Sequence, residues 1–298
     1  MDLPSLFVSH GSPMIALEPG AAGAFLQRLG TAIDAAFGRP RAVLAISAHT
    51  TARSPALLAA AQHDTVHDFG GFPDALYALR YDAPGAPALA EDVAARLAAA
   101  GIGAPRIDRG GLDHGIWTAL RFVYPQADVP VLPLALVPDL PPAQLFALGE
   151  ALAALRSEGV LVLGSGSITH NLRLVFSARP QGAGARHGAD TADSDELPES
   201  RAFRDWFAAR SAARDWDALF DYRARAPHAA LMHPTDEHLL PWYPAAGAGG
   251  RASAPLRLHE GVTLSSLGMD AYAFGDAATV LQSALRSASP STPPSTPH

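Results

Sequence analysis

The 298-residue sequence contains no cysteine, and its 22 basic side chains are all arginine because it contains no lysine either. Without cysteine the protein has no disulfide, thiolate nucleophile, iron–sulfur cluster or cysteine zinc site. Without lysine it has no Schiff-base residue, no attachment point for pyridoxal phosphate and no P-loop lysine. Histidine, with 12 residues, is the reactive side chain in unusual supply.

The charge and hydropathy patterns exclude further partners. The net charge is −7 and there is no basic run, which disfavours a nucleic acid backbone as partner. No apolar stretch reaches the ~18 residues of a membrane span, and the first residues lack a signal-peptide pattern. We therefore expect a cytoplasmic monomer or homodimer that binds neither nucleic acid nor a membrane.

Alternating apolar runs and amphipathic segments predict an α/β fold with a single main sheet, mostly parallel or mixed, flanked by helices. Strands are expected at residues 6–8, 43–46, 56–61, 159–164 and 264–274, and at 129–137 near a sheet edge or at a bulge because two prolines interrupt that run. Helices are expected at residues 21–37, 86–100, 115–123, 142–156, 201–210, 214–222 and 235–240.

The composition along the chain predicts one catalytic unit. A length of 298 residues allows about two domains, but a single α/β unit of this size is also ordinary. We expect the catalytic domain over residues 1–276, with a loop insertion at 178–200 that is rich in Gly, Ala, Asp and Ser. Residues 277–298 are expected to add the end of a helix and a disordered tail of Pro, Ser and Thr.

Three of the apolar strands are each followed within a few residues by a histidine: His10, His49 and His170. In open α/β sheets ligands bind beyond the carboxyl ends of the strands, so the active site is expected there and the three imidazoles could meet. The segment 164–166 is interpreted as a flexible turn that carries His170 toward this point. Imidazole is a ligand for Zn, Fe, Cu or Ni. The alternative is that each is an ordinary hydrogen-bonded loop histidine.

Other candidates have weaker positional support. His114 stands before a glycine that permits close approach to a ligand, or it is simply the first residue of a helix. His238 follows a predicted helix start, and its neighbour Glu237 is a possible carboxylate ligand. Adjacent helical residues point about 100° apart, so only one of the two is expected to ligate.

The loop 67–73 combines His67, Phe69 and Phe72 with two glycines, which suits gripping an aromatic ring. A surface loop packed by its own aromatic side chains is the alternative. The remaining histidines have no supporting context and are expected at the surface: His63, His187, His228, His259 and His298.

Taken together in their order, these motifs carry a family likeness: residues 9–14, 47–49, 67–73, 113–115, 164–171 and 234–238. Over roughly residues 5–275 the sequence resembles the DOPA-dioxygenase branch of the class III extradiol ring-cleavage dioxygenases, the LigB-like enzymes. The resemblance implies that a catechol-type ring is opened beside one hydroxyl group with O2. It also implies one non-haem divalent metal, Fe(II) for activity, with Zn(II) fitting the same nitrogens but unable to supply electrons to O2.

The resemblance also implies roles for single residues. His10, His49 and His238 match the metal ligands, and His170 is a fourth ligand or a base. His170 and His114, in that order, are the candidates for base and acid. His67, Phe69 and Phe72 would border the substrate. The alternative functions are a zinc hydrolase whose bound water has a pKa near ~7, a chelatase, and a non-catalytic metal-binding protein closed by four histidines.

Overall fold

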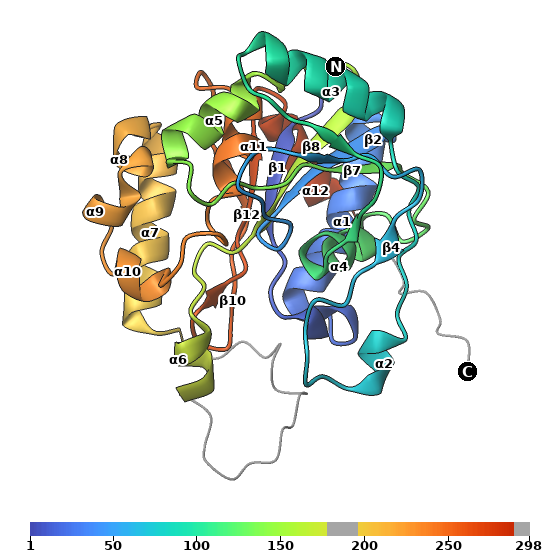
Figure 1. Ribbon diagram of the computed structural model, residues 1–298. Coiled ribbons are helices and arrows are strands. Elements are labelled where there is room, and N and C mark those ends of the chain that lie inside the picture. Colours follow the sequence, from blue (N-terminus) through green and yellow to red (C-terminus); the bar gives the residue numbers. More distant parts are fainter. Residues whose placement is uncertain (178–195, 289–298) are drawn as a thin grey trace.

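The computed structural model describes residues 1–177 and 196–288 and is built around one six-stranded sheet (Figure 1). The strand order is β7 (Val131–Pro133), β2 (Ala42–Ser47), β8 (Val160–Gly166), β1 (Ser5–Ser9), β12 (Ala271–Phe274) and β9 (Leu256–His259). The first four strands run parallel, β12 pairs antiparallel with β1, and β9 pairs antiparallel with β12. The predicted α/β class with a mixed main sheet is confirmed, and the proline-interrupted strand does lie at an edge.

Side chains alternate across the sheet, so each face has its own apolar core. Phe7 of β1 packs into one core, and its neighbours Leu6 and Val8 pack into the other. In β8, Val162 and Leu161 divide in the same way. This alternation follows from the two-residue period of a strand, and it explains why the central strands are apolar throughout.

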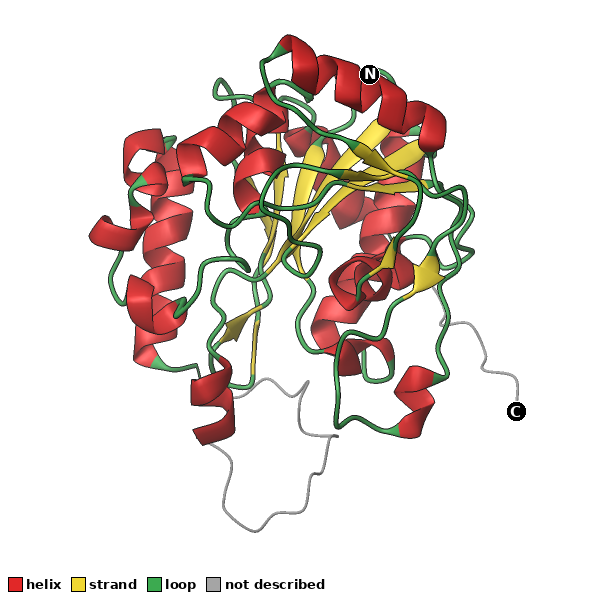
Figure 2. Ribbon diagram, viewed as in Figure 1, coloured by secondary structure: helices red, strands yellow, loops and turns green. Residues whose placement is uncertain are grey.

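Helices cover both faces of the sheet, as Figure 2 shows. The face of Leu6 and Val8 is covered by α1 (Gly20–Phe37), α4 (His114–Val123) and α12 (Ala278–Ser287). The face of Phe7 is covered by α3 (Pro87–Ala99), α5 (Pro142–Glu150), α7 (Pro198–Ala213) and α11 (Trp242–Gly249). Within the two described ranges no helix is long and apolar enough to cross a membrane.

Short elements complete the chain. Three two-stranded ladders pair β3 (Leu57–Leu58) with β5 (Arg106–Ile107), β4 (Asp64–Thr65) with β6 (Gly111–Leu112), and β10 (Val262–Thr263) with β11 (Leu267–Gly268). The short helices are α2 (Asp74–Tyr77), α6 (Leu172–Ser177), α8 (Trp216–Phe220), α9 (Tyr222–Arg225) and α10 (Ala229–Met232), with 3-10 turns at Pro13–Ala16 and Ala153–Arg156. In Figure 1, α2 and α6 lie at the same end of the molecule.

Several predicted boundaries are wrong. The helix expected at 235–240 is a single turn closed on the Asp236 carbonyl, and α11 begins only at Trp242. Pro241 explains the break, because a residue before proline is disfavoured in helical conformation. The expected strand 264–274 divides into β11 and β12, and 56–61 keeps only two strand residues. The loop expected to reach residue 200 ends earlier, since α7 starts at Pro198, while 178–195 and the tail from 289 lie outside the described residues.

Two glycines of β8 let the segment that carries His238 lie directly on the sheet. A Cβ atom on Gly166 would stand 2.0 Å from the His238 carbonyl oxygen, and one on Gly164 would stand 2.2 Å from the Pro241 oxygen. The Ser167 N–H donates to the same His238 oxygen at 2.8 Å. The interpretation of residues 164–166 as a flexible turn is therefore wrong, since these residues are buried in β8 and act as a docking face.

Gly166→Ala should lower the free energy of unfolding by about 1–3 kcal/mol, the usual cost of overpacking a core. On an open strand the same change would stabilise, because glycine loses more chain entropy on folding than alanine. Urea unfolding measures the difference. Gly103→Ala is the matched control, since a Cβ atom there meets nothing within 4 Å. An unchanged or higher unfolding free energy in Gly166→Ala would contradict the close contact.

Candidate metal centre

Four histidines lie together at the edge of the sheet where the parallel strands end. His10 follows β1, His49 follows β2 and His170 follows β8. His238 comes from the turn that packs on the glycine face of β8. The ring centroid of His10 lies 5.0 Å from that of His49 and 5.5 Å from that of His238, and the last two are 4.9 Å apart. The structure thus joins three strand-end residues with one from a distant turn.

The spacing of three of these rings fits one shared ion. One nitrogen each from His10, His49 and His238 lies within 4.8 Å of the other two. His10 Nε2 and His49 Nε2 are 3.1 Å apart. Zinc–nitrogen bonds are about 2.0–2.1 Å long, so two nitrogens on one ion stand about 3 Å apart. The His10 and His49 nitrogens already meet that spacing, and the His238 nitrogen lies within 4.8 Å of both.

Hydrogen bonds fix which nitrogen of His10 faces this centre. The Ser165 hydroxyl donates to the Gly115 carbonyl oxygen at 2.5 Å, so its oxygen is left to accept from His10 Nδ1 at 2.9 Å. With the proton on Nδ1, the neutral ring carries its lone pair on Nε2. The buried serine therefore selects the tautomer in which Nε2 is a ligand atom.

Carboxylates hold the other two rings in the same sense. His49 Nδ1 lies 3.4 Å from Asp68 Oδ2, and His238 Nδ1 lies 3.1 Å from Glu237 Oε1. Glu237 accepts the Nδ1 proton of His238, and the negative charge of Asp68 favours the proton of His49 on Nδ1, the nitrogen that faces it. Both contacts leave Nε2 unprotonated, as partners of metal-binding histidines do. Of the two neighbouring residues, His238 is the one whose nitrogen lies near those of His10 and His49. Glu237 contacts the Nδ1 of His238.

Burial keeps these imidazoles neutral. Burial, followed by the neighbouring His114, lowers the pKa of His49 to about 3. Burial and the surrounding rings hold the pKa values of His10 and His238 well below the ordinary value. At neutral pH all three rings are therefore uncharged, which is the form that binds a metal.

His170 meets the cluster in a different geometry. Its ring stacks on His238 with centroids 3.5 Å apart and planes only 5° from parallel. A ring nitrogen binds an ion in the plane of its own ring, because its lone pair lies there. Because the rings of His170 and His238 are stacked and nearly parallel, their in-plane lone pairs point along separate lines. Burial lowers the pKa of His170 to about 4, so this ring is also neutral.

Asp68 joins His114 to His49. Its Oδ1 accepts from both the backbone N–H and the Nδ1 of His114, each at 3.0 Å, while Oδ2 faces His49. Burial alone would raise the pKa of Asp68, but the hydrogen bonds and charge of His114 bring it down to about 2. Asp113 caps α4 by accepting from the Ile116 N–H at 3.2 Å, which fixes His114 at the first position of that helix.

The cluster lines a cavity of about 330 Å³, within the range of about 300–1,000 Å³ typical of small-molecule sites. Phe69 and Phe72 line the same cavity, with ring centroids 5.3 Å apart in an edge-to-face contact. His67, expected beside the substrate, is not among the lining residues. Its Nε2 donates to the Leu79 carbonyl oxygen at 3.2 Å, and its ring packs near Trp117. Within loop 67–73 the aromatic pair, rather than the histidine, faces the cavity.

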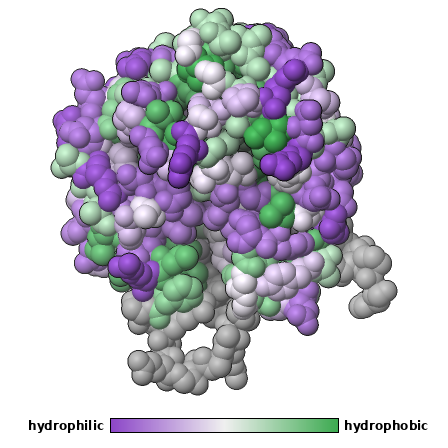
Figure 3. Space-filling model, viewed as in Figure 1, coloured by the Kyte–Doolittle hydropathy of each residue, from purple (hydrophilic) through white to green (hydrophobic). Residues whose placement is uncertain are grey.

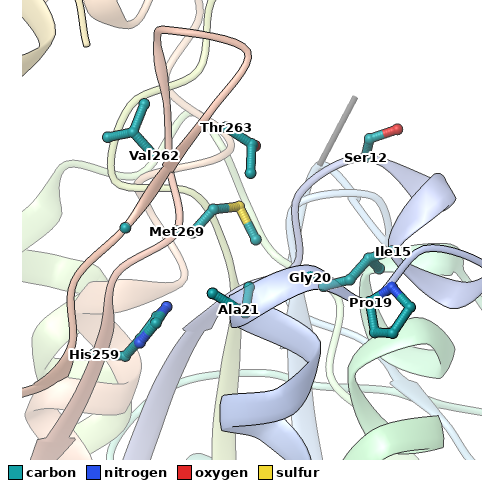
Figure 4. Close-up of a pocket in the computed structure, with 11 residues that line it drawn as sticks. Ser12, Ile15, Pro19, Gly20, Ala21, His259, Val262, Thr263 and Met269 are labelled. Atoms are coloured by element: carbon teal, nitrogen blue, oxygen red, sulfur yellow. The ribbon is translucent and has the colours of Figure 1, made fainter. Parts of the chain in front are cut away.

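A second hollow shares Ser12 with this cavity but cannot hold an aromatic ring. Figure 4 shows it between the start of α1 and the strands near Met269. Its volume is only about 20 Å³, which is room for about one water molecule. The cavity of about 330 Å³ is the candidate substrate site because the four histidines line it.

Histidines outside the cluster have structural contacts. His63 was expected at the surface but is only 1% exposed. Its buried Nε2 is satisfied by donating to the Val131 carbonyl oxygen at 3.0 Å. His233 is fully buried and donates in the same way to Ile168 at 2.8 Å. His259 stacks on Phe25, while His187 and His298 lie outside the described residues.

The sequence interpretation missed the residues that orient the rings. Ser165 and Asp68 lie inside quoted motifs, but serine and aspartate serve many purposes in loops and strands. The one available signal was position: Ser165 alternates with the two glycines of β8, so it must face the opposite side of the sheet. The apolar residues of α6 that line the cavity were not expected either.

The fold and the cavity define an α/β protein whose candidate active site is built from histidines at strand ends. A family model described as the catalytic LigB subunit of aromatic ring-opening dioxygenase matches residues 4–275. The chain belongs to this family.

Individual relatives agree with this assignment. A Beta vulgaris protein named 4,5-DOPA dioxygenase extradiol is 35% identical over 257 residues, which cover 86% of this chain and 90% of that protein. An Escherichia coli K12 protein of the same name is 35% identical over 273 residues, covering 90% and 93%. The crystal structure of an uncharacterized E. coli K12 protein matches with a TM-score of 0.73 and 30% identity, over 92% of this chain and all of that one. The protein is an extradiol aromatic ring-cleaving dioxygenase.

Ser165→Ala should release the tautomer of His10. The variant removes the acceptor of the Nδ1 proton, so the ring should populate both neutral tautomers instead of one. Nitrogen-15 NMR of histidine-labelled protein reads this as a shift of the His10 ring resonances toward averaged values. Ser157→Ala, at an exposed serine, should leave them in place. A His10 spectrum that is identical in wild type and Ser165→Ala would show that the serine does not select the tautomer.

Proposed function

We propose that the enzyme opens catechol-type rings with O2, using one divalent non-haem metal held by His10, His49 and His238. The observation that supports this most strongly is that each of the three rings has its Nδ1 beside an oxygen acceptor. Their Nε2 lone pairs are thereby left for an ion, and burial keeps the rings neutral. The donor set of borderline nitrogens suits Fe(II), and it suits Zn(II) equally well.

A bound Fe(II) would supply the electrons and the open coordination positions that bring a catechol and O2 together. The chain must add a ring-binding surface and proton transfer. Phe69 and Phe72 offer aromatic faces and edges to the substrate ring. Aromatic rings prefer offset or edge-to-face contacts, and both are open to a ring beside this pair. We assign no substrate contact to His67, because its Nε2 donates to a backbone carbonyl.

His170 is the proposed general base. It lies in the cavity and is neutral, so a ring nitrogen can take the proton from a catechol hydroxyl. Its stacking on His238 favours this role over that of a fourth ligand, because the two ring planes do not meet at one ion. His114 is the proposed acid: Asp68 holds its Nδ1, so Nε2 is the nitrogen that can exchange a proton with the substrate.

The protein loaded with Fe(II) should convert 4-methylcatechol to a yellow ring-opened product in air and should do nothing without O2. The protein loaded with Zn(II) should be inactive, since Zn(II) has no redox chemistry. Visible absorbance under aerobic and anaerobic conditions measures both. A zinc hydrolase would act without O2, and neither a chelatase nor a metal carrier would open the ring. Activity in the absence of O2, or a failure of the Fe(II)-loaded protein to open the ring, would overturn the proposal.

Changes to the four histidines should divide into two classes. His10→Ala, His49→Ala and His238→Ala should each lose stoichiometric metal, as measured by elemental analysis, while the circular dichroism of the fold is kept. His170→Gln should keep the metal and bind catechol but lose about 10²–10⁴ in rate, the usual contribution of general acid–base catalysis. His228→Ala, at a histidine outside the cavity, is the control. Full metal retention in the first three variants, or normal turnover in His170→Gln, would contradict these roles.

A further inference from the structure

Hydrogen bonds to the end of α10 hold the backbone at His170. The His170 N–H donates to the Met232 carbonyl oxygen at 2.9 Å. The side-chain amide of Asn171 donates to the Leu231 carbonyl oxygen at 2.6 Å. Both acceptors belong to the last turn of α10, where carbonyl groups have no partner within the helix. The position of His170 therefore depends on the position of this helix end.

The residue that follows α10, His233, adds a bond from its side chain. Its Nε2 donates to the Ile168 carbonyl oxygen at 2.8 Å, two residues before His170. Because a carbonyl oxygen can only accept, this contact fixes the proton of the neutral ring on Nε2. The ring packs against Phe203 with centroids 5.3 Å apart. Figure 3 shows mainly hydrophilic side chains on the outer surface over α8, α9 and α10, whereas His233 is 0% exposed.

The same two chain segments carry both the proposed base and a metal ligand. The Ser167 N–H donates to the His238 carbonyl oxygen at 2.8 Å. Arg223 holds the intervening turn, because its Nη1 donates to the His233 carbonyl oxygen and, at 2.5 Å, to Asp236 Oδ1. Residues 167–171 and 231–238 thus form one hydrogen-bonded unit, and the stacked rings of the base and the ligand belong to its two halves.

We propose that His233 is a positioning residue for the general base. Its bond to Ile168 holds the loop in the place where the ring of His170 lies over His238 and faces the cavity. The inference rests on the proposed function, because it takes His170 as the base. A displacement of about 1 Å at a reacting group can cost about 10²-fold in rate. His233 is not one of the described residues that line the cavity, so it acts through the loop.

His233→Phe removes this bond and keeps a buried ring. It removes no second bond, since Nδ1 of His233 has no hydrogen-bond partner among the described residues. For Fe(II)-loaded protein with 4-methylcatechol, kcat should fall by about 10²-fold, while KM and the metal content stay near the wild-type values. His233→Gln should recover most of the rate, because its amide nitrogen can replace Nε2 as the donor. Equal kcat in wild type and His233→Phe, or a loss of metal that accounts for the loss of rate, would overturn the inference.

A second pair of variants serves if the larger ring of phenylalanine prevents folding. His233→Asn and His233→Gln both place an amide in the site and differ by one methylene group. The shorter amide cannot reach the Ile168 carbonyl oxygen from this backbone position, and the longer one can. kcat should therefore be low in His233→Asn and near the wild-type value in His233→Gln. Equal kcat in the two variants would contradict the role of the bond.

His63→Phe is the matched control for a general loss of stability. His63 is also buried, donates from Nε2 to a backbone carbonyl oxygen and has no partner for Nδ1 among the described residues. It is not one of the described residues that line the cavity. Urea unfolding should show a lower free energy of unfolding in both phenylalanine variants, but kcat should fall only in His233→Phe. An equal fall in His63→Phe would overturn the inference, because both variants would then act through stability alone.

The ring of His170 also reports its position without turnover. It lies over the ring of His238, with centroids 3.5 Å apart and planes 5° from parallel, so the ring current of His238 shifts its proton resonances. In NMR spectra of Zn(II)-loaded, histidine-labelled protein, the signal missing from His170→Gln identifies this ring. It should move toward the value of an unstacked imidazole in His233→Phe, and stay in place in His233→Gln and His63→Phe. An unmoved signal in His233→Phe would overturn the inference.

The two measurements separate this inference from the function beneath it. If the wild-type protein opens no catechol but the His170 signal moves in His233→Phe, then the proposed reaction is wrong and the positioning role stands. If the wild-type protein opens the ring and the signal does not move, then the reaction stands and the positioning role is wrong.

Discussion

The parallel pairing of β2, β8 and β1 is the constraint on which the site depends. The register sets Ser47 opposite Ser165, and Ser9 opposite Gly166, so the three strands end almost level. After each of the three strands, the backbone leaves the sheet within a few residues of this common edge. Side chains on those turns begin close together whatever the loops do afterwards, which is why catalytic groups so often stand beyond the carboxyl ends of parallel strands. The fourth histidine joins them only because the glycines of β8 give its backbone a place to lie.

Geometry alone would leave each imidazole free to present either nitrogen. The oxygen acceptors remove that freedom, and they come from three different places: a buried serine for His10, a loop carboxylate for His49 and the adjacent carboxylate for His238. Because the rings are neutral, a divalent ion would bring two positive charges. Asp68 and Glu237 would balance these charges from behind the rings of His49 and His238. The site is thus prepared electrostatically before any ligand arrives, and its cost is that several polar groups stay buried in fixed pairs.

Much of the fold could be read from the sequence, and the site only in part. Apolar runs of three to six residues, each followed within a few residues by His10, His49 or His170, predicted the three central strands and their shared edge, since periodicity and chain order carry that information locally. His238 lacked such a signal: its position depends on Gly164 and Gly166 being bare on one face, a contact between residues far apart in sequence. The helix expected at 235–240 failed because Pro241 outweighed the apolar pattern. The contribution of α6 to the cavity could not be predicted, because the sequence pattern of a short apolar helix is the same whether it faces a core or a cavity.

Asp68 and the aromatic pair Phe69 and Phe72 stand on one short loop, and this has a mechanical consequence. The carboxylate of that loop holds His49 and His114 together, while its rings line the space beside them. A displacement that moves the rings also drags the carboxylate, and with it the orientation of two imidazoles. The loop therefore couples the shape of the cavity to the orientation of its imidazoles. A ligand that displaces Phe69 would also displace Asp68 and so change the orientation of His49.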